Sequence, residues 1–289
     1  MNSSSHIIIN ADDFGLSSAV NEAVFAASEH GILSSATIMA NMPGFDEAAK
    51  GARGNGRLGV GVHLNLLRGS PISEPSLIHT LVRSNGKFLG NARSLALRIL
   101  FGRLDPLHVE TELCAQVEKV ISCGIKPTHL DSEKHMHLAS PMIGKTACRV
   151  AKRFGIRCIR VARELEHVIK SDDGPKLTQR LKSLFISSQS RRFAKIAAGF
   201  GLKFTDSFFG ISFTGRMTQD VYHKLFSALP CKTLEIMTHP AASAGAANIA
   251  GEKSWLDCRR VHEYRALLDA SLKDALIENE ISLITYDEL

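Results

Sequence analysis

Two adjacent carboxylates follow an unbroken apolar run near the start of the chain. The run Ile7–Ile9 leads into Asp12 and Asp13, and a helical pattern begins shortly after them. Two like charges side by side at the end of a buried strand are tolerated where a cation offsets them. One aspartate can then bind the ion while its neighbour accepts a proton from water. A plainer interpretation is that the pair caps the helix that follows.

Imidazoles and further acids follow three other strand-like runs. His63 lies in the alternating run "LGVGVHLNL", where Gly59 and Gly61 share its side of the strand and would leave room for a ligand or ion. His239 ends the run "LEIMTH". Each signal alone is explained by a core histidine or a turn. Together they predict a catalytic site for a divalent cation, Mg²⁺ or Zn²⁺. The third run, "THLDSEKHMH", adds His129, Asp131, Glu133 and His135.

The elements that must bring these side chains together alternate between strands and helices. Because the carboxyl ends of parallel strands collect at one edge, the acids and imidazoles would meet there. Seven or eight strand–helix units predict an α/β fold, a distorted (β/α) barrel with mostly parallel strands, and an open doubly wound sheet is the alternative. The expected strands are His6–Asn10, Ala36–Asn41, Leu58–Leu66, Thr128–Asp131, Arg157–Val161, Ser207–Ser212, Leu234–Thr238 and Ile281–Thr285. The expected helices include Val109–Ser122, Pro141–Phe154, Thr218–Leu229 and Cys258–Ile277.

Two segments interrupt this alternation within what we expect to be one domain, residues 1–289. The segment of about residues 67–106 is rich in Gly, Pro and Ser, and about residues 164–205 carry a basic cluster. Between Lys145 and Lys203 there are fifteen Lys or Arg residues against four acids. Both insertions are long enough to be functional loops, and the basic one is either a lid or partner surface or a solvated helical face.

Composition excludes several classes of protein. The 289 residues are 44% apolar, enough for a large core, but no apolar run approaches the roughly 20 residues of a membrane span. The net charge of +6 is local, and no nucleic-acid motif accompanies it. We expect no signal peptide, and six cysteines scattered without a CxxC pair favour reduced thiols in the cytoplasm.

Four motifs carry a resemblance to a known family. "NADDFG", "GVHLNL", "THLDSEKHMH" and "EIMTHPA", in this order, resemble the YdjC-like family of carbohydrate deacetylases, which includes the chitooligosaccharide deacetylases and the hopanoid-associated HpnK proteins. The similarity spans nearly the whole chain and extends more distantly to the polysaccharide deacetylases. It implies a distorted (β/α) barrel, one divalent metal ion and hydrolysis of an N-acetyl group from an amino sugar.

The resemblance also implies roles for particular residues. Asp13 and His63 match metal ligands, Asp12 matches the general base, and His239 matches the acid or oxyanion partner. Many members have a histidine after the serine of the fourth-strand motif, where this chain has Glu133. Glutamate binds Mg²⁺ or Zn²⁺, so Glu133 is the expected third ligand. The alternatives for that position are His135 and His129.

If they are not ligands, His129 and His135 are expected to bind substrate or to support the ligands. Arg160 and Asp131 would also support this site. Arg160 falls where members place an arginine on the fifth strand, so it would orient Asp12 or hold the substrate. Asp131 would fix the tautomer of a ligand imidazole. The expected substrate is an N-acetylated carbohydrate, with no nucleic acid and no membrane span, and a homodimer is left open. The alternatives are phosphoester or other amide hydrolysis, or a weakly catalytic carbohydrate-binding protein.

Overall fold

A parallel sheet forms the centre of the molecule in the computed structural model, which describes residues 5–165, 177–245 and 257–289. Within those residues, eight strands belong to this one sheet, and all of their pairings are parallel. Each matches one of the expected strands. They are β1 (Ser5–Phe14), β2 (Ser35–Ile38), β3 (Gly59–Leu64), β4 (His129–Ser132), β5 (Cys158–Ile159), β6 (Ser207–Phe209), β7 (Thr233–Thr238) and β8 (Ile281–Leu283).

The order of the strands shows that the sheet curls into a barrel. It runs β5-β4-β3-β2-β1-β7-β6, and β8 pairs with the first residues of β1. The two edges also approach each other, because parallel bridges join Cys158 to Lys203 and Glu164 to Phe208. The predicted distorted (β/α) barrel is therefore confirmed, and the open doubly wound sheet is wrong.

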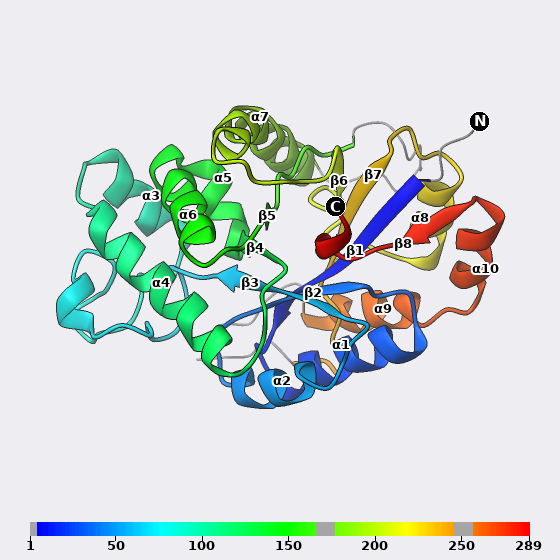
Figure 1. The fold of residues 1–289 in the computed structure, drawn as a ribbon, viewed down its shortest axis with the longest axis horizontal. Coiled ribbons are helices and arrows are strands. Elements are labelled where there is room, and N and C mark those ends of the chain that lie inside the picture. The colour runs from blue at the N-terminus through cyan, green and yellow to red at the C-terminus, as the bar shows by residue number, and fades with distance from the viewer. Residues whose placement is uncertain (1–4, 166–176, 246–256) are drawn as a thin grey trace.

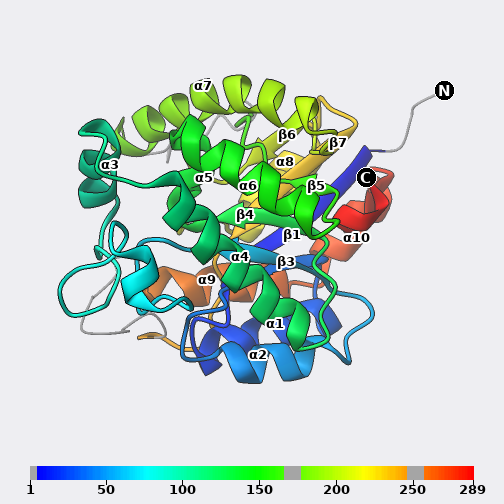
Figure 2. The same cartoon turned by 60° about the vertical axis from the view of Figure 1, so that its left-hand side comes forward.

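Helices cover the sheet on opposite sides. In both views α1 and α2 lie below the sheet, and α5, α6 and α7 lie above it (Figures 1 and 2). The α-helices are α1 (Ser18–His30), α2 (Phe45–Ala52), α3 (Ala92–Leu100), α4 (Pro106–Ser122), α5 (Met136–Ala139), α6 (Pro141–Arg153), α7 (Leu177–Gly199), α8 (Gln219–Phe226), α9 (Asp257–Leu267) and α10 (Ser271–Glu278). Short 3₁₀ turns are η1 (Pro75–Ile78), η2 (Glu133–His135) and η3 (Tyr286–Glu288).

The first strand and helix show how the sequence builds these elements. Ile7–Ile9 are fully buried on both faces of β1, as a barrel strand requires. Ser17 caps α1 by accepting a hydrogen bond from the backbone N–H of Val20. The helix ends at Gly31, whose backbone N–H bonds the carbonyl of Ala27. Local signals therefore set where this unit begins and ends.

One expected helix is wrong in its extent. The pattern Cys258–Ile277 predicts a single helix, but the structure has α9 and α10 instead. Asp269 lies between them and accepts hydrogen bonds from the backbone N–H and the hydroxyl of Ser271. This side-chain bond competes with helical pairing at the break between the two helices.

The two insertions contain helices of their own. Residues 67–106 include η1 and α3, and α7 fills residues 177–199 of the basic segment, whose residues 166–176 lie outside the described part. Across the described residues, no helix combines the length and apolar character that a bilayer crossing requires. The six cysteines are free, and Cys114, Cys148 and Cys158 are buried.

Candidate metal and catalytic site

A bulge at the end of β1 explains how two adjacent aspartates serve one site. In a regular strand successive side chains point to opposite faces. The pairing of β1 with β2 shifts register between Ala11 and Phe14, and Asp13 has a left-handed φ of 67°. Such a conformation is costly for a residue with a Cβ and is concentrated at functional sites. Because of the bulge, both aspartates reach the surroundings of His63.

His63 in β3 is oriented by Asp131 of the neighbouring strand β4. The two residues are register partners, and Nδ1 of His63 lies 2.8 Å from Oδ1 of Asp131. The Thr37 hydroxyl donates to the other carboxylate oxygen of Asp131 at 3.1 Å. Burial acts to lower the pKa of His63, but the Asp131 carboxylate outweighs it and raises that pKa well above the usual value. This contact leaves Nε2 of His63 as the ring nitrogen that faces the other acids.

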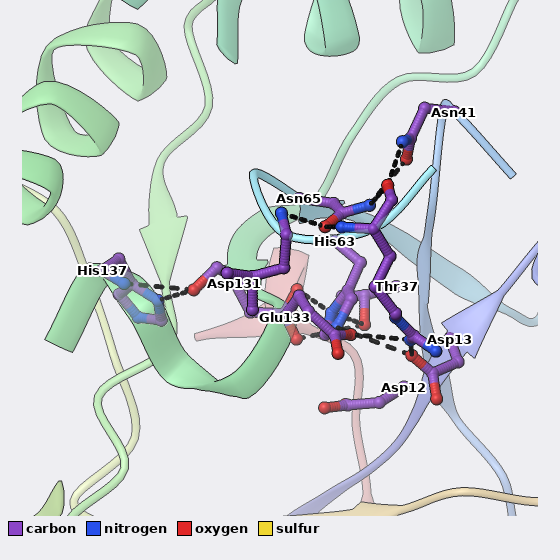
Figure 3. A network of polar contacts seen from close by, with 12 residues as sticks. Asp12, Asp13, Thr37, Asn41, His63, Asn65, Asp131, Glu133 and His137 are labelled. Carbon is purple, nitrogen blue, oxygen red and sulfur yellow. Dashed lines mark hydrogen bonds and ion pairs between the residues drawn. The ribbon is translucent and has the colours of Figure 1, made fainter. Parts of the chain in front are cut away.

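Asp13, His63 and Glu133 form a buried group with the chemistry of a metal site. Nε2 of His63 lies 3.5 Å from Oε2 of Glu133 and 3.9 Å from Oδ1 of Asp13. One ligand atom from each lies within 4.8 Å of the others. Figure 3 draws these residues within a continuous polar network. Two carboxylates and an imidazole, with the imidazole held by Asp131, fit a divalent cation such as Mg²⁺ or Zn²⁺.

A second group of Asp12, His63 and Asp131 is also close enough to hold an ion. Its two carboxylates, however, already share the guanidinium of Arg160, which lies 2.7 Å from each of them. Arg160 is fully buried and also contacts Glu235 of β7. A single, fully buried guanidinium thus bridges both acids of this group, whereas Arg68, which contacts Asp13 and Glu133, is 20% exposed. The group with Glu133 is therefore the better candidate for a cation.

Glu133 lies at the start of a strained turn that follows β4. The strand ends at Ser132, and Lys134 and His135 follow with left-handed φ values of 51° and 55°. The Ser132 hydroxyl fixes the turn through hydrogen bonds with His137, one to the ring Nδ1 at 2.6 Å. Burial acts to raise the pKa of Glu133, but Arg68 outweighs it and the net pKa is lowered. The carboxylate is therefore charged at neutral pH.

Asp12 is held by two neighbours. Arg160 binds both of its carboxylate oxygens, at 2.7 and 2.8 Å, and the Asn10 amide donates to one of them at 3.0 Å. Burial acts to raise the pKa of Asp12, yet Arg160 holds it well below its usual range. The expected contact between Arg160 and Asp12 is thus present. It keeps Asp12 ionised and fixes its orientation.

Two arginines that sequence reasoning missed also reach the acids. Arg68 donates to Glu133 at 3.0 Å, and Arg260 of α9 contacts Asp13. Arg68 lies in the loop just after β3, at the same sheet edge as the acids, so its position in the sequence could have indicated it. Nothing in the sequence pattern of α9 indicates Arg260. The ion pairs of the site join five carboxylates (Asp12, Asp13, Asp131, Glu133, Glu235) to three guanidinium groups (Arg68, Arg160, Arg260). A cation bound at Nε2 would displace the proton of His63, and the five carboxylates would then exceed the three guanidinium groups by two negative charges, which a divalent cation would balance.

His239 lies beside the aspartate pair at the end of β7. Thr238 is the register partner of Ala11 in β1, so His239 and Asp12 follow paired positions at the ends of neighbouring strands. The backbone N–H of His239 donates to Glu263, and its ring Nδ1 is buried with no hydrogen-bond partner among the described residues. An imidazole with an unused nitrogen beside the acids can exchange a proton with a bound molecule.

His129 and His135 lie outside the group of candidate ligands. His129 stacks on Tyr286 with ring centroids 3.7 Å apart, and burial lowers its pKa to about 3. His135 packs edge-on against Phe208. The interpretation of Gly61 as space for a ligand is wrong, since a Cβ there would lie 2.4 Å from the His129 ring. Gly61 instead makes room for that imidazole.

Comparison with known proteins identifies relatives of this chain. The family described as YdjC-like protein matches residues 6–278. A carbohydrate deacetylase of Geobacillus stearothermophilus is 32% identical, covering 98% of this chain and 97% of its own. A carbohydrate deacetylase of Brevibacillus brevis is 30% identical, covering 98% and 99%. A crystal structure from Enterococcus faecalis V583, provisionally assigned to cellobiose-phosphate cleavage, shares the fold with a TM-score of 0.78, 22% identity and 99% coverage of both chains.

Proposed function

The chain belongs to the YdjC-like protein family, and from that membership we propose that it is a metal-dependent carbohydrate N-deacetylase. Its substrate is an amino sugar, or an N-acetylated oligosaccharide or glycolipid. Water cleaves the amide bond, and the products are acetate and a free amine. Two relatives that match over nearly their full length are named carbohydrate deacetylase.

The observation that carries the metal dependence is the buried group of Asp13, His63 and Glu133. Their ligand atoms lie within 4.8 Å of one another, and Asp131 holds His63 so that Nε2 faces the two acids. These three residues would hold one Mg²⁺ or Zn²⁺ ion. When bound, the ion would polarise the amide carbonyl as a Lewis acid and make water a better nucleophile.

Asp12 and His239 divide the proton transfers between them. Asp12 is ionised and fixed by Arg160, so it accepts the proton of the attacking water. Asp12 would be a weak base on the strength of its pKa alone, and its position beside the ligand group is what makes it the candidate. His239 offers a ring nitrogen without a partner among the described residues, and it donates a proton to the leaving amine.

Acetate release from a panel of N-acetylated sugars tests the function directly. The protein is assayed after metal removal by chelation, and again after addition of Mg²⁺ or Zn²⁺. We expect no acetate from the metal-free protein and restored release with one of the ions. Full activity after rigorous metal removal contradicts the metal dependence. Phosphate release without acetate would favour phosphoester hydrolysis, and sugar binding without turnover would favour a binding protein.

A further inference from the structure

Helix α7 has an apolar stripe that the barrel does not use. One face of the helix packs inward, including the buried residues Ile186, Phe193 and Ala197. The opposite face carries four large apolar side chains that are exposed, with Leu177 at 72%, Leu181 at 58%, and Leu184 and Phe185 near half. Scattered exposed leucines are ordinary, but a stripe on one helix face indicates a contact surface. Both views show α7 at the edge of the molecule (Figures 1 and 2).

The same outward face is strongly basic. With 3.6 residues per turn, the apolar stripe and the exposed residues Arg191, Arg192 and Lys195 fall within a sector of about 120°. The apolar side chains occupy the N-terminal half of this sector and the basic ones the C-terminal half. The helix contains no Asp or Glu. We call Leu177, Leu181, Leu184, Phe185, Arg191, Arg192 and Lys195 the α7 outer face.

We propose that the α7 outer face docks the protein on an anionic lipid bilayer as a peripheral contact. A bilayer surface offers anionic headgroups and an apolar interior at the same place, which matches a helix face with both basic and apolar side chains. Leucine and phenylalanine side chains insert between the headgroups while the arginines and lysine remain at the level of the phosphates. This binding is separate from the deacetylase activity and does not depend on it.

Charge argues against a second copy of the chain as the occupant. Two such faces brought together would place Arg191, Arg192 and Lys195 of each copy against a surface without acids. Like charges at an interface are repulsive, and desolvating them is costly. A partner surface that carries negative charge is therefore required, and the exposed leucines need an apolar phase beside that charge.

Sedimentation with lipid vesicles tests the proposal on the full chain. Vesicles of phosphatidylglycerol and phosphatidylcholine are compared with pure phosphatidylcholine at low and high salt. We expect binding to the anionic vesicles alone, weakened by salt. Each basic residue contributes about fivefold to binding near such a surface, so Arg191→Gln, Arg192→Gln and Lys195→Gln together should weaken it on the order of a hundredfold.

Two further variants test whether the apolar side chains of α7 in particular, rather than any exposed apolar side chain, are needed for vesicle binding. Leu181→Ser combined with Phe185→Ser should abolish vesicle binding. Ile277→Ser is the matched control, because Ile277 is an apolar side chain of α10 that is 76% exposed and lies outside α7. It should bind as the unmodified protein does. Circular dichroism and acetate release from a soluble substrate should be unchanged in all variants, which shows that the fold is intact.

Three results would overturn the proposal. The first is no sedimentation of the unmodified protein with anionic vesicles at low salt. The second is binding that the α7 substitutions leave unchanged. The third is a concentration-dependent dimer that Leu181→Ser with Phe185→Ser dissociates, without any vesicle binding, because it identifies a second copy as the occupant.

Discussion

Replacing Asp131 by asparagine tests whether the orientation of His63 creates the metal site. Asp131 accepts from Nδ1 of His63 at 2.8 Å with one oxygen and contacts Arg160 at 2.7 Å with the other. An asparagine has only one acceptor oxygen. If its NH₂ group faces Arg160, two donors oppose each other. If the NH₂ group faces Nδ1, the imidazole must carry its proton on Nε2, the nitrogen that the ion needs.

Either orientation of the introduced amide should therefore weaken metal binding while the protein remains folded. Partners of ligand imidazoles contribute 10- to 100-fold to metal affinity, which corresponds to about 1.4–2.7 kcal/mol. Arg160 keeps Asp12 and Glu235 as partners, so its charge stays compensated. The protein should retain its circular dichroism spectrum, and acetate release at subsaturating metal should fall with the affinity.

Isothermal titration of the metal-free protein with Zn²⁺ measures this loss. Asp274→Asn is the matched control, since Asp274 is an exposed residue of α10, and the same change of side chain there should leave the affinity unchanged. If Asp131→Asn bound Zn²⁺ as tightly as the unmodified protein does, the assignment of His63 Nε2 as a ligand oriented by Asp131 would be refuted.

Substitutions at four further residues test the remaining assignments. Asp13→Ala should lose metal and activity together, whereas Asp12→Asn should keep the metal and lose roughly 10²–10⁴ in turnover. If metal titration shows the same loss of metal in both variants, Asp12 is a second ligand. Glu133→His should keep activity and shift the preference toward Zn²⁺ in a competition assay, and unchanged metal affinity in Glu133→Ala would point to His135 instead. Burial lowers the pKa of His129 to about 3, below its unfolded value, so the unfolded state binds the extra proton and stability falls as pH drops from about 6.5 to 3. His129→Phe should reduce that dependence by about 1.4 kcal/mol per pH unit in urea unfolding, and an unchanged slope would mean that His129 is already charged in the native state.

The sequence predicted the barrel because its strands are signalled locally. Buried runs such as Ile7–Ile9 must lie in a sheet covered on both faces, and helical patterns between them leave only parallel pairing. The sequence also predicted that the acids meet at one edge of the sheet, because the carboxyl ends of parallel strands lie together there. The exact ends of the elements did not follow, because bonds such as that between Asp269 and Ser271 outweigh apolar periodicity.

Local patterns also identified the residues that could do chemistry, but not their partners. The types and positions of Asp13, His63 and Glu133 are set by the sequence, together with the expectation that they meet at the strand ends. Arg260 contacts Asp13, which lies 247 positions earlier in the chain. The sequence pattern of α9 does not predict this contact. Such contacts arise only when the barrel closes.

Packing likewise decided the surroundings of Glu133, His129 and His135. The motif "THLDSEKHMH" offered Glu133, His135 and His129 as alternatives for one role, and their spacing could not separate them. In the folded protein the Glu133 carboxylate faces His63 and Arg68, and the space left by Gly61 takes the ring of His129. The sequence by itself determined which side chains were available at each strand end. The tertiary structure decided which of them face one another, because a side chain's direction depends on bulges, turns and neighbouring volumes that distant parts of the chain supply.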